Sequence, residues 1–470
     1  MACPLLSLMV FLSMIALQAI TYCRAALVSP PDTHGNQLKD GSDPSWHVQY
    51  DPVKMEMHMK TMTNISLRIE GFEKTQLGDD ATIQLKSERN HVATIPNGSI
   101  TVVEIKDDGS YEGGFDISGV FLGTTNLYVE VMDKNNQTIQ SVEKMPITVI
   151  REERAIDHIF TGSVAVLVCV MFVLFGAAMD LPTVKAIIMK PIGPAIGFFS
   201  QFLFMPLLSY GLGLLLFPDS FEMQLGLFFT GVSPGGGASN IWTVLLGANL
   251  NLSLAMTTIS TLAAFGMMPL WIFTLGRKIF ERGNLVVPYT NLATFAVGLI
   301  IPMGIGLLCQ RYTPRLARIL VRILKPCSAL LILFIVVFAI VTNLYLFELF
   351  SWQIIAAGLG LPWIGYLFGF IVSKSARLPT ADALAISIET GIQNTGIAIF
   401  LLRFSLPQPA ADLTTVVPVS AAIMTPVPLM ILYVVLKIRE RNFSHRSIVP
   451  FPDVQYVNLK RCHTTPPKIH

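Results

Sequence analysis

Charged residues are scarce in this chain. Only 14% of its 470 residues are Asp, Glu, Lys or Arg, whereas 52% are hydrophobic. Soluble globular proteins carry about 25% charged residues, so this composition excludes an ordinary soluble domain and predicts an integral membrane protein in a lipid bilayer. The formal net charge is only +2, and no stripe of basic and aromatic residues is present. We therefore expect no nucleic-acid partner.

Motifs of enzyme chemistry are also absent. The sequence contains no metal, nucleotide or nucleophile motif. The glycine run at 235–237 does not follow a strand and lacks the lysine of a phosphate-binding loop. We therefore expect that the protein is not an enzyme.

Cysteine is missing from the whole segment between residues 26 and 157. The six cysteines of the chain lie outside it, at Cys3, Cys23, Cys169, Cys309, Cys327 and Cys462. A domain in this segment has no disulfide framework and must be held together by its hydrophobic core.

The N-terminus resembles a targeting segment. An apolar run from Pro4 to Ile20 is followed by small residues around Ala25, which predicts a signal peptide over residues 1–25. The region before the run has no basic residue, so an uncleaved anchor helix is the alternative. Residues 26–46 are rich in Pro, Gly, Asp and Ser and predict a flexible linker.

Residues 47–152 alternate between apolar and polar side chains, as in 65–69, 81–85 and 127–131. Short alternating runs separated by turn residues predict a small β-sandwich-like domain. Three glycosylation sequons begin in it, at Asn64, Asn97 and Asn136. We therefore expect this domain to be extracellular and glycosylated.

Apolar runs dominate residues 158–438 and predict an all-α polytopic domain with about nine transmembrane helices, followed by a cytoplasmic tail over 439–470. Each run has about 20 residues, enough to cross a bilayer. The expected centres are Val168, Phe204, Gly231, Ser260, Val297, Ile332, Leu361, Gly391 and Met424.

Basic residues between the apolar runs predict the orientation, because cytoplasmic loops are enriched in Lys and Arg. With the N-terminus outside and the C-terminus in the cytoplasm, most basic loops fall inside, including the cluster at 311–325. The group at 277–282 and the single residue Arg403 disagree. The majority predicts an extracellular N-terminus, and we expect the plasma membrane as the location.

Two apolar stretches contain helix-breaking segments, at 234–240 and 389–396. Open backbone groups at bilayer depth are tolerated only in a cavity or inside the protein. Interrupted helices in corresponding parts of two halves are the best sequence indicator of a transporter binding site.

The second break carries the carboxylate of Glu389, and a carboxylate at bilayer depth usually marks a functional site. The alternative is a carboxylate near a helix end that reaches interfacial water around Thr380 and Asp382. Gln393 lies four residues further on and shares its helix face, while Gly391 allows local unwinding that frees the carbonyls of Thr390 and Ile392. These are oxygen ligands of the kind that a hard cation needs.

Further polar residues lie in neighbouring spans. Ser239 and Asn240 follow the glycine run, and Ser253 and Thr257 lie four residues apart in the next span. A Ser/Thr pair in a membrane helix often bonds only to its own backbone, which is the alternative for the last two. Gln201 lies in a long apolar run, where interhelical hydrogen bonding is the alternative to ion binding.

At these residues the chain resembles the bile acid:sodium symporter family, over about residues 158–438. The resemblance rests on motifs at 201–206, 234–240, 252–261, 267–269 and 389–394. It implies a core domain and a panel domain, with two broken helices crossing in the core. The N-terminal domain is similar to that of less characterised family members with an ectodomain.

The resemblance also implies Na⁺ as the coupled ion, bound at two sites that share Glu389. One site would use Ser239, Asn240, Ser253, Thr257 and Glu389. The other would use Gln201, Glu389, Gln393 and backbone carbonyls near Thr390 and Ile392.

These features predict a sodium-coupled symporter of an amphipathic organic anion, such as a bile acid or steroid conjugate, working by alternating access. A non-transporting membrane protein, whose ectodomain binds a partner, is the alternative. A buried carboxylate disfavours it, because a pure anchor has no use for Glu389. A channel is a further possibility, but no ring-forming filter motif is present.

Overall fold

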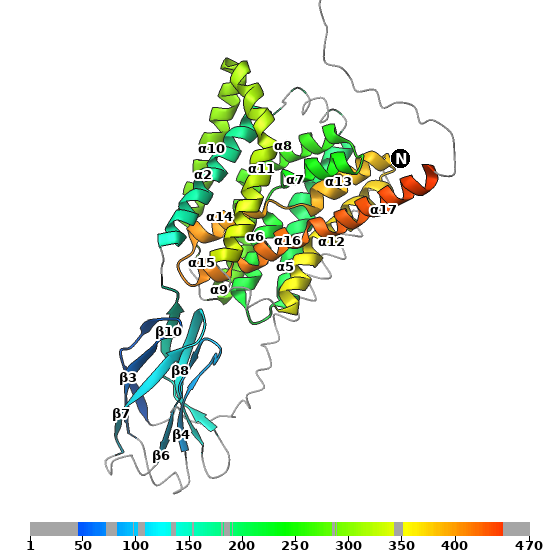
Figure 1. Ribbon diagram of the computed structural model, residues 1–470. Helices are drawn as coiled ribbons and strands as arrows, with labels where there is room; N and C mark the ends of the chain where they lie inside the picture. The colour runs from blue at the N-terminus through cyan, green and yellow to red at the C-terminus, as the bar shows by residue number, and fades with distance from the viewer. Residues whose placement is uncertain are drawn as a thin grey trace, which may run out of the picture. The chain divides into compact units, whose positions relative to one another are not determined.

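The computed structural model describes residues 46–71, 82–96, 98–101, 109–132, 138–152, 155–179, 182, 189, 191–283, 287, 289–342 and 351–444 (Figure 1). The predicted signal peptide, nearly all of the predicted linker, Asn97, Asn136 and most of the predicted tail lie outside these residues. The chain divides into a large unit up to Pro426 and a second unit from Val427 onward.

The N-terminal region consists of two β-sheets. The first contains, in spatial order, β1 (His47–Asp51), β3 (Met62–Glu70), β7 (Tyr111–Gly119) and β5 (Ala93–Thr94). The second contains β2 (Met55–His58), β10 (Met145–Ile150), β8 (Gly123–Met132), β4 (Thr82–Ser87) and β6 (Ser99–Thr101), with β9 (Thr138–Gln140) also on β8. Only the β2–β10 pair is parallel among these described strands.

Both sheets bury every second side chain, as the pleat of a strand requires. On β3 the buried residues include Ile65 and Leu67, and on β10 they include Met145 and Ile147. All four belong to one hydrophobic cluster that draws on both sheets. The strand-rich region predicted from the alternating pattern is confirmed, and its core holds it without a disulfide.

The rest of the chain is helical. The helices are α2 (Ala155–Ala178), α4 (Ile192–Phe199), η3 (Ser200–Phe204), α5 (Met205–Leu216), α6 (Phe221–Val232), α7 (Ala238–Leu245), α8 (Leu250–Trp271), η4 (Ile272–Gly276), α9 (Arg277–Arg282), α10 (Tyr289–Tyr312), α11 (Pro314–Thr342), α12 (Trp352–Ser375), α13 (Thr380–Gly391), α14 (Thr395–Ser405), α15 (Ala410–Leu413), α16 (Val416–Met424) and α17 (Pro426–Ser444).

Every expected span centre lies in one of these helices. Among the described residues, four helical segments are long and apolar enough to cross a bilayer: Ile192–Leu216, Leu250–Arg282, Trp352–Ser375 and Ala410–Arg439. The helical membrane fold is therefore confirmed, and the chain is an integral membrane protein. The total of nine spans stays a prediction.

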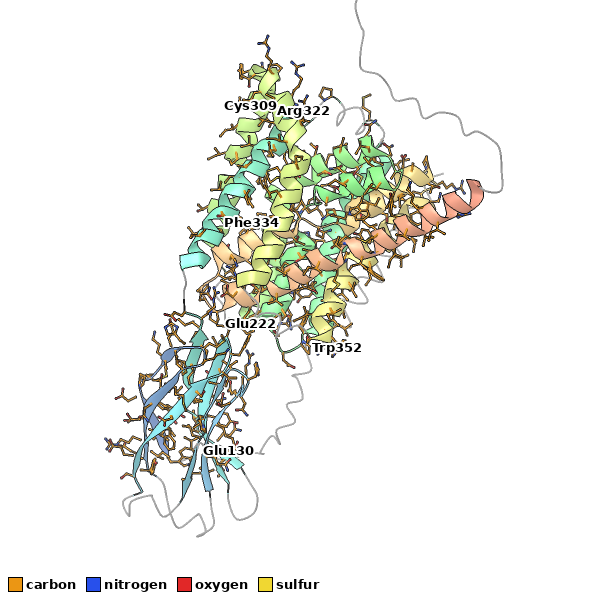
Figure 2. All side chains as sticks on the ribbon, in the orientation of Figure 1. Glu130, Glu222, Cys309, Arg322, Phe334 and Trp352 are labelled. Atoms are coloured by element: carbon orange, nitrogen blue, oxygen red, sulfur yellow. The ribbon has the colours of Figure 1, made fainter. Side chains whose placement is uncertain are left out.

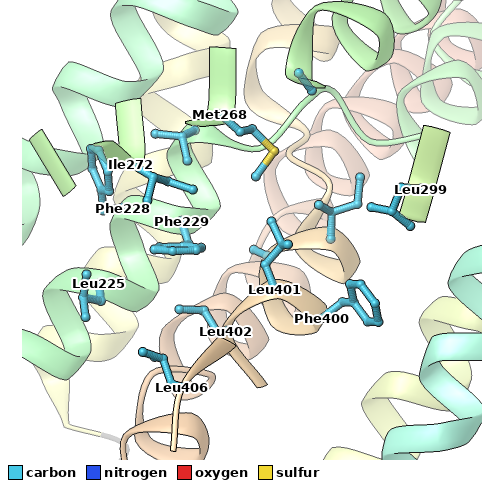
Figure 3. Packing of buried hydrophobic residues seen from close by; sticks show 14 of the residues in the cluster. Leu225, Phe228, Phe229, Met268, Ile272, Leu299, Phe400, Leu401, Leu402 and Leu406 are labelled. Carbon is cyan, nitrogen blue, oxygen red and sulfur yellow. The ribbon is translucent and has the colours of Figure 1, made fainter. Parts of the chain in front are cut away.

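The helices up to Pro426 pack around three clusters of buried apolar residues. Part of one cluster lies where α6, α8 and α14 meet, and Phe229, Met268 and Leu401 belong to it (Figure 3). To one side, α2 packs against α10 and α11, and elsewhere α12 packs against α13 and α16. The interrupted helices are largely buried in α6, α13 and α14, whereas α7 exposes Val244 and Leu245.

Candidate cation-binding site

Two interrupted helices form the centre of the site. One stops at Val232 and resumes at Ala238, so that α6 and α7 are its halves; the other stops at Gly391 and resumes at Thr395, with α13 and α14 as its halves. Both interruptions occur where the sequence predicts them.

The two breaks are paired with each other through their backbones. Gly235 and Gln393 form an antiparallel bridge. The Gly236 amide donates to the Ile392 carbonyl at 2.8 Å, and the Asn394 amide donates to the Pro234 carbonyl at 2.9 Å. Each break therefore satisfies backbone groups that the other leaves open, as the membrane interior requires.

Glycine is needed at this crossing because the chains approach too closely for a side chain. A Cβ at Gly235 would overlap the Glu389 carboxylate, and a Cβ at Gly236 would come within 2.9 Å of the Gln393 carbonyl oxygen. Asn394 caps the start of α14, since its side-chain oxygen accepts from the Ile397 amide at 3.2 Å.

The Glu389 carboxylate lies beside the crossing and is only 2% exposed. The Thr257 hydroxyl donates to its Oε1 at 2.8 Å, and the Ser253 hydroxyl is 3.3 Å from its Oε2. Hydroxyl donors favour the charged form of a carboxylate. The predicted neighbours on α8 therefore do reach Glu389, although Thr257 also bonds back to the Ser253 carbonyl at 3.0 Å.

Ser239 and Asn240, at the start of α7, complete this oxygen-rich cluster. The Asn240 side-chain oxygen accepts from Ser253 at 3.0 Å. The fully buried Ser239 hydroxyl interacts with Glu389 but without hydrogen-bond geometry, and it has no other partner in the described part of the chain. The five side chains of the first predicted sodium site thus lie together, and the Ser239 hydroxyl oxygen among them makes no regular hydrogen bond within that part of the chain.

Gln201 and Gln393 form a second polar group. Gln201 Nε2 donates to Gln393 Oε1 and to the Ser233 carbonyl, each at 2.7 Å. Gln393 Nε2 donates to the Thr390 carbonyl at 2.7 Å. The structure therefore brings the two amides together with the carbonyl of Thr390. Within the described residues, no hydrogen bond links either amide to Glu389.

Thr243 adds a hydroxyl that is not among the predicted site residues. Its hydroxyl is fully buried and lies 3.2 Å from that of Ser253, while it donates to the Ser239 carbonyl at 2.8 Å. A signal was available, because Thr243 is four residues after Ser239 and shares its face of the helix.

An apolar cavity of about 40 Å³ lies next to the crossing. It is lined by Pro234 of the first break and Ile397 of α14, together with Phe172 of α2, Met268 of α8 and Leu299 of α10. Thr261 is the polar side chain among its lining residues. The cavity therefore lies between the first helix break and the helices α2 and α10.

Comparison with known proteins identifies relatives of this chain. Residues 165–348 match the model of the sodium bile acid symporter family. The human P3 protein is 29% identical over 279 residues, which are 59% of this chain and 57% of that protein. The hepatic sodium/bile acid cotransporter of Homo sapiens is 31% identical over 255 residues, covering 52% of this chain and 72% of the relative.

The ileal sodium/bile acid cotransporter of Cricetulus griseus is 32% identical over 241 residues, which are 51% of this chain and 68% of that protein. The chain spans just over half the length of the human, bovine and mouse P3 proteins, and over two thirds of the ileal and hepatic relatives described above. On the family match and this identity, the chain belongs to the sodium bile acid symporter family.

Proposed function

We propose that the protein is a sodium-coupled symporter of an amphipathic organic anion, of the bile acid or steroid conjugate kind. The observation that carries this proposal is the buried Glu389 carboxylate amid hydroxyl and amide oxygens at the paired helix breaks. Relatives named as sodium/bile acid cotransporters and as a sodium-dependent organic anion transporter support it.

The chemistry of the cluster suits a small monovalent cation. A single buried negative charge is costly in a membrane protein unless it is paired, and one Na⁺ would neutralise it. Ligands from Ser239, Asn240, Ser253, Thr257 and Glu389 are all hard oxygens. The Ser239 hydroxyl, whose only interaction among the described residues is the one with Glu389 that lacks hydrogen-bond geometry, is the oxygen that an ion would use most readily.

A second sodium site at Gln201 and Gln393 would require a local rearrangement. Both amides and the carbonyls of Thr390 and Ile392 already accept or donate hydrogen bonds. An ion would replace these bonds, with the amide oxygens turned toward it and toward Glu389. We therefore expect weaker sodium binding here than at the Ser239 cluster.

Substrate entry requires a larger movement. Pockets for drug-sized ligands have volumes of about 300–1,000 Å³, whereas the apolar cavity has about 40 Å³. A steroid-sized anion would fit only if α2 and α10 moved away from α8 and α14. This is the rocking of one helix group against another that alternating access involves.

The test is Glu389→Gln in the purified full-length protein. This change removes the negative charge and preserves the shape. We expect NaCl, compared with an equal concentration of choline chloride, to raise the melting temperature of the wild type. Saturation at 100 times Kd would stabilise it by about 2.7 kcal/mol. The variant should lose this sodium effect while remaining folded, because a neutral amide is easier to bury than a carboxylate.

Glu222→Gln is the matched control, because Glu222 is also buried, at 6% exposure, but lies at the start of α6 away from the cluster. It should keep the sodium effect. Wild-type sodium dependence in Glu389→Gln would contradict the proposal and favour the alternative of a membrane anchor whose ectodomain binds a partner.

A further inference from the structure

The longest stretch without acidic residues surrounds a dense group of basic residues. From Gly283 to Phe347 the chain has no Asp or Glu. Within this stretch five basic residues recur at spacings of four, three, four and three: Arg311, Arg315, Arg318, Arg322 and Lys325. Such spacing places residues on one face of a helix.

The structure places these residues on a tight helical hairpin. The helix α10 ends at Tyr312 and α11 begins at Pro314, so only Thr313 separates them (Figure 1). Arg311 lies at the end of α10, and Arg315, Arg318 and Arg322 lie on the first two and a half turns of α11. Figure 2 labels Arg322. All four side chains are exposed.

These four arginines have no acidic partner in the described part of the chain. Their polar and aromatic contacts are weak: Arg318 Nε donates to the Pro314 carbonyl at 3.4 Å, and the Arg311 guanidinium lies 5.9 Å from the centre of the Tyr312 ring. Their charge is therefore available to an external anion.

Exposed apolar side chains lie directly beside the basic ones. Leu316, Ile319 and Ile323 each follow an arginine and are 44%, 54% and 40% exposed. They form a second, apolar stripe next to the basic stripe. A helix that exposes both kinds of side chain is typical of the headgroup region of a membrane. There the apolar side chains contact acyl chains, and the cationic side chains remain hydrated.

With α11 crossing the bilayer as the apolar run centred on Ile332 predicts, its length places the arginines at that depth. Its 29 residues extend over about 44 Å at 1.5 Å per residue, whereas the hydrocarbon core is about 30 Å thick. The part from Pro326 to Thr342 has no charged residue. The surplus of roughly 14 Å therefore lies at the arginine end, in the headgroup layer.

We propose that the basic hairpin, defined as residues 311–322, binds anionic phospholipid headgroups. Guanidinium groups match phosphate oxygens in pairs, and a negatively charged leaflet attracts basic residues that lie within a Debye length of its surface. The site is distinct from the crossing and does not depend on transport.

The experiment uses the full-length protein in neutral detergent with equal amounts of phosphatidylserine and phosphatidylcholine that carry the same acyl chains. Native mass spectrometry counts the lipids that remain bound. We expect the wild type to retain roughly tenfold more phosphatidylserine, in line with several cations acting at one surface. Arg315→Gln/Arg318→Gln/Arg322→Gln should lose this preference, while the corresponding triple Lys variant should keep most of it.

A control with the same charge change removes Lys374, Arg377 and Lys437, each replaced by Gln; it should bind phosphatidylserine as the wild type does. An unchanged preference in the triple Arg→Gln variant would overturn the proposal, as would an equal loss in the control.

Inorganic phosphate or inositol phosphate, added at the same concentration as the lipid, should not displace phosphatidylserine. Full displacement would indicate a site for soluble anions and overturn the assignment to lipid. If the triple variant does not fold, single Arg322→Gln and a rise in salt from about 50 to about 500 mM must each weaken the preference. If either leaves the preference unchanged, the proposal fails.

Discussion

At the scale of single residues, Asp412 is a buried charge outside the crossing that has two basic partners. Asp412 is fully buried, and its Oδ1 accepts from Arg403 Nη2 at 2.8 Å, while Arg151 Nη2 lies 3.7 Å from its Oδ2. Both arginine side chains are at most 10% exposed. Breaking a buried ion pair of this kind costs free energy of folding, because the remaining partner is then a buried charge with neither a counter-charge nor water around it.

We predict that Asp412→Asn strongly destabilises the protein. Two buried guanidinium groups would lose their shared counter-charge, and breaking a buried pair costs about 3–5 kcal/mol. The melting temperature of the purified protein measures this loss. The matched control is Glu281→Gln, since Glu281 pairs with Arg277 at an exposed position, and it should leave the melting temperature unchanged. Equal effects of the two variants would contradict the burial argument.

Two of the residues that disagree with the charge bias in the sequence lie in ion pairs. Arg403 pairs with Asp412, and Arg277 pairs with Glu281. The pairing of Arg277 follows the helical spacing of four and could be read from the sequence. That of Arg403 could not, because it depends on the turn between α14 and α15, which has no periodic pattern.

At the scale of helices, the sequence locates the two breaks but not how they meet. Glycine runs in apolar stretches reveal where a helix cannot continue. The pairing of Gly235 with Gln393 joins residues far apart in sequence, so spacing alone contains no information on it. Only the family resemblance predicts that the two broken helices cross.

For the same reason, the face shared by Glu389 and Gln393 was a poor guide to their contacts. The chain leaves helical geometry after Gly391, so a spacing of four no longer places two side chains together. Glu389 turns to Ser253 and Thr257, while Gln393 turns to Gln201.

We predict that Gly235→Ala impairs sodium binding. Its new methyl group would overlap the Glu389 carboxylate and force the crossing to shift. The melting temperature of the variant should respond much less to NaCl than that of the wild type. Gly266→Ala in α8 is the matched control, since a Cβ there meets open space. The control should keep the sodium effect and gain up to about 1 kcal/mol of stability from helix propensity. Full sodium dependence in Gly235→Ala would show that the crossing tolerates a side chain.

At the scale of the whole molecule, the change from alternating to continuous apolar patterning separates a strand-rich region from a helical one. Alternation predicts which strands exist and which faces are buried, as on β3 and β10. It does not predict the order of strands in the sheets, because β2 pairs in parallel with β10 across about ninety residues. Long-range pairing of this kind depends on the packing of the complete domain.

The N-terminal domain also provides the test of topology. Asn64 lies on β3 with an exposed side chain that donates to Asp116 at 3.0 Å, and Ser66 completes its sequon. An exposed sequon on a domain outside the cell should be glycosylated, so endoglycosidase treatment should increase the gel mobility of protein from glycosylating cells.

Replacing Asn64, Asn97 and Asn136 by Gln should abolish the shift. Asn251→Gln should not, because that sequon ends at Ser253, which is fully buried beside Glu389.

With the N-terminal domain outside the cell, the basic residues that follow the apolar part of α17 predict a cytoplasmic C-terminus. An epitope after His470 should then stain only in permeabilised cells. Staining of intact cells would overturn the nine-span count or the orientation, and a persistent lack of any glycosidase shift would count against the topology. With a reversed orientation, the basic hairpin would face the outer leaflet, which contains little anionic lipid.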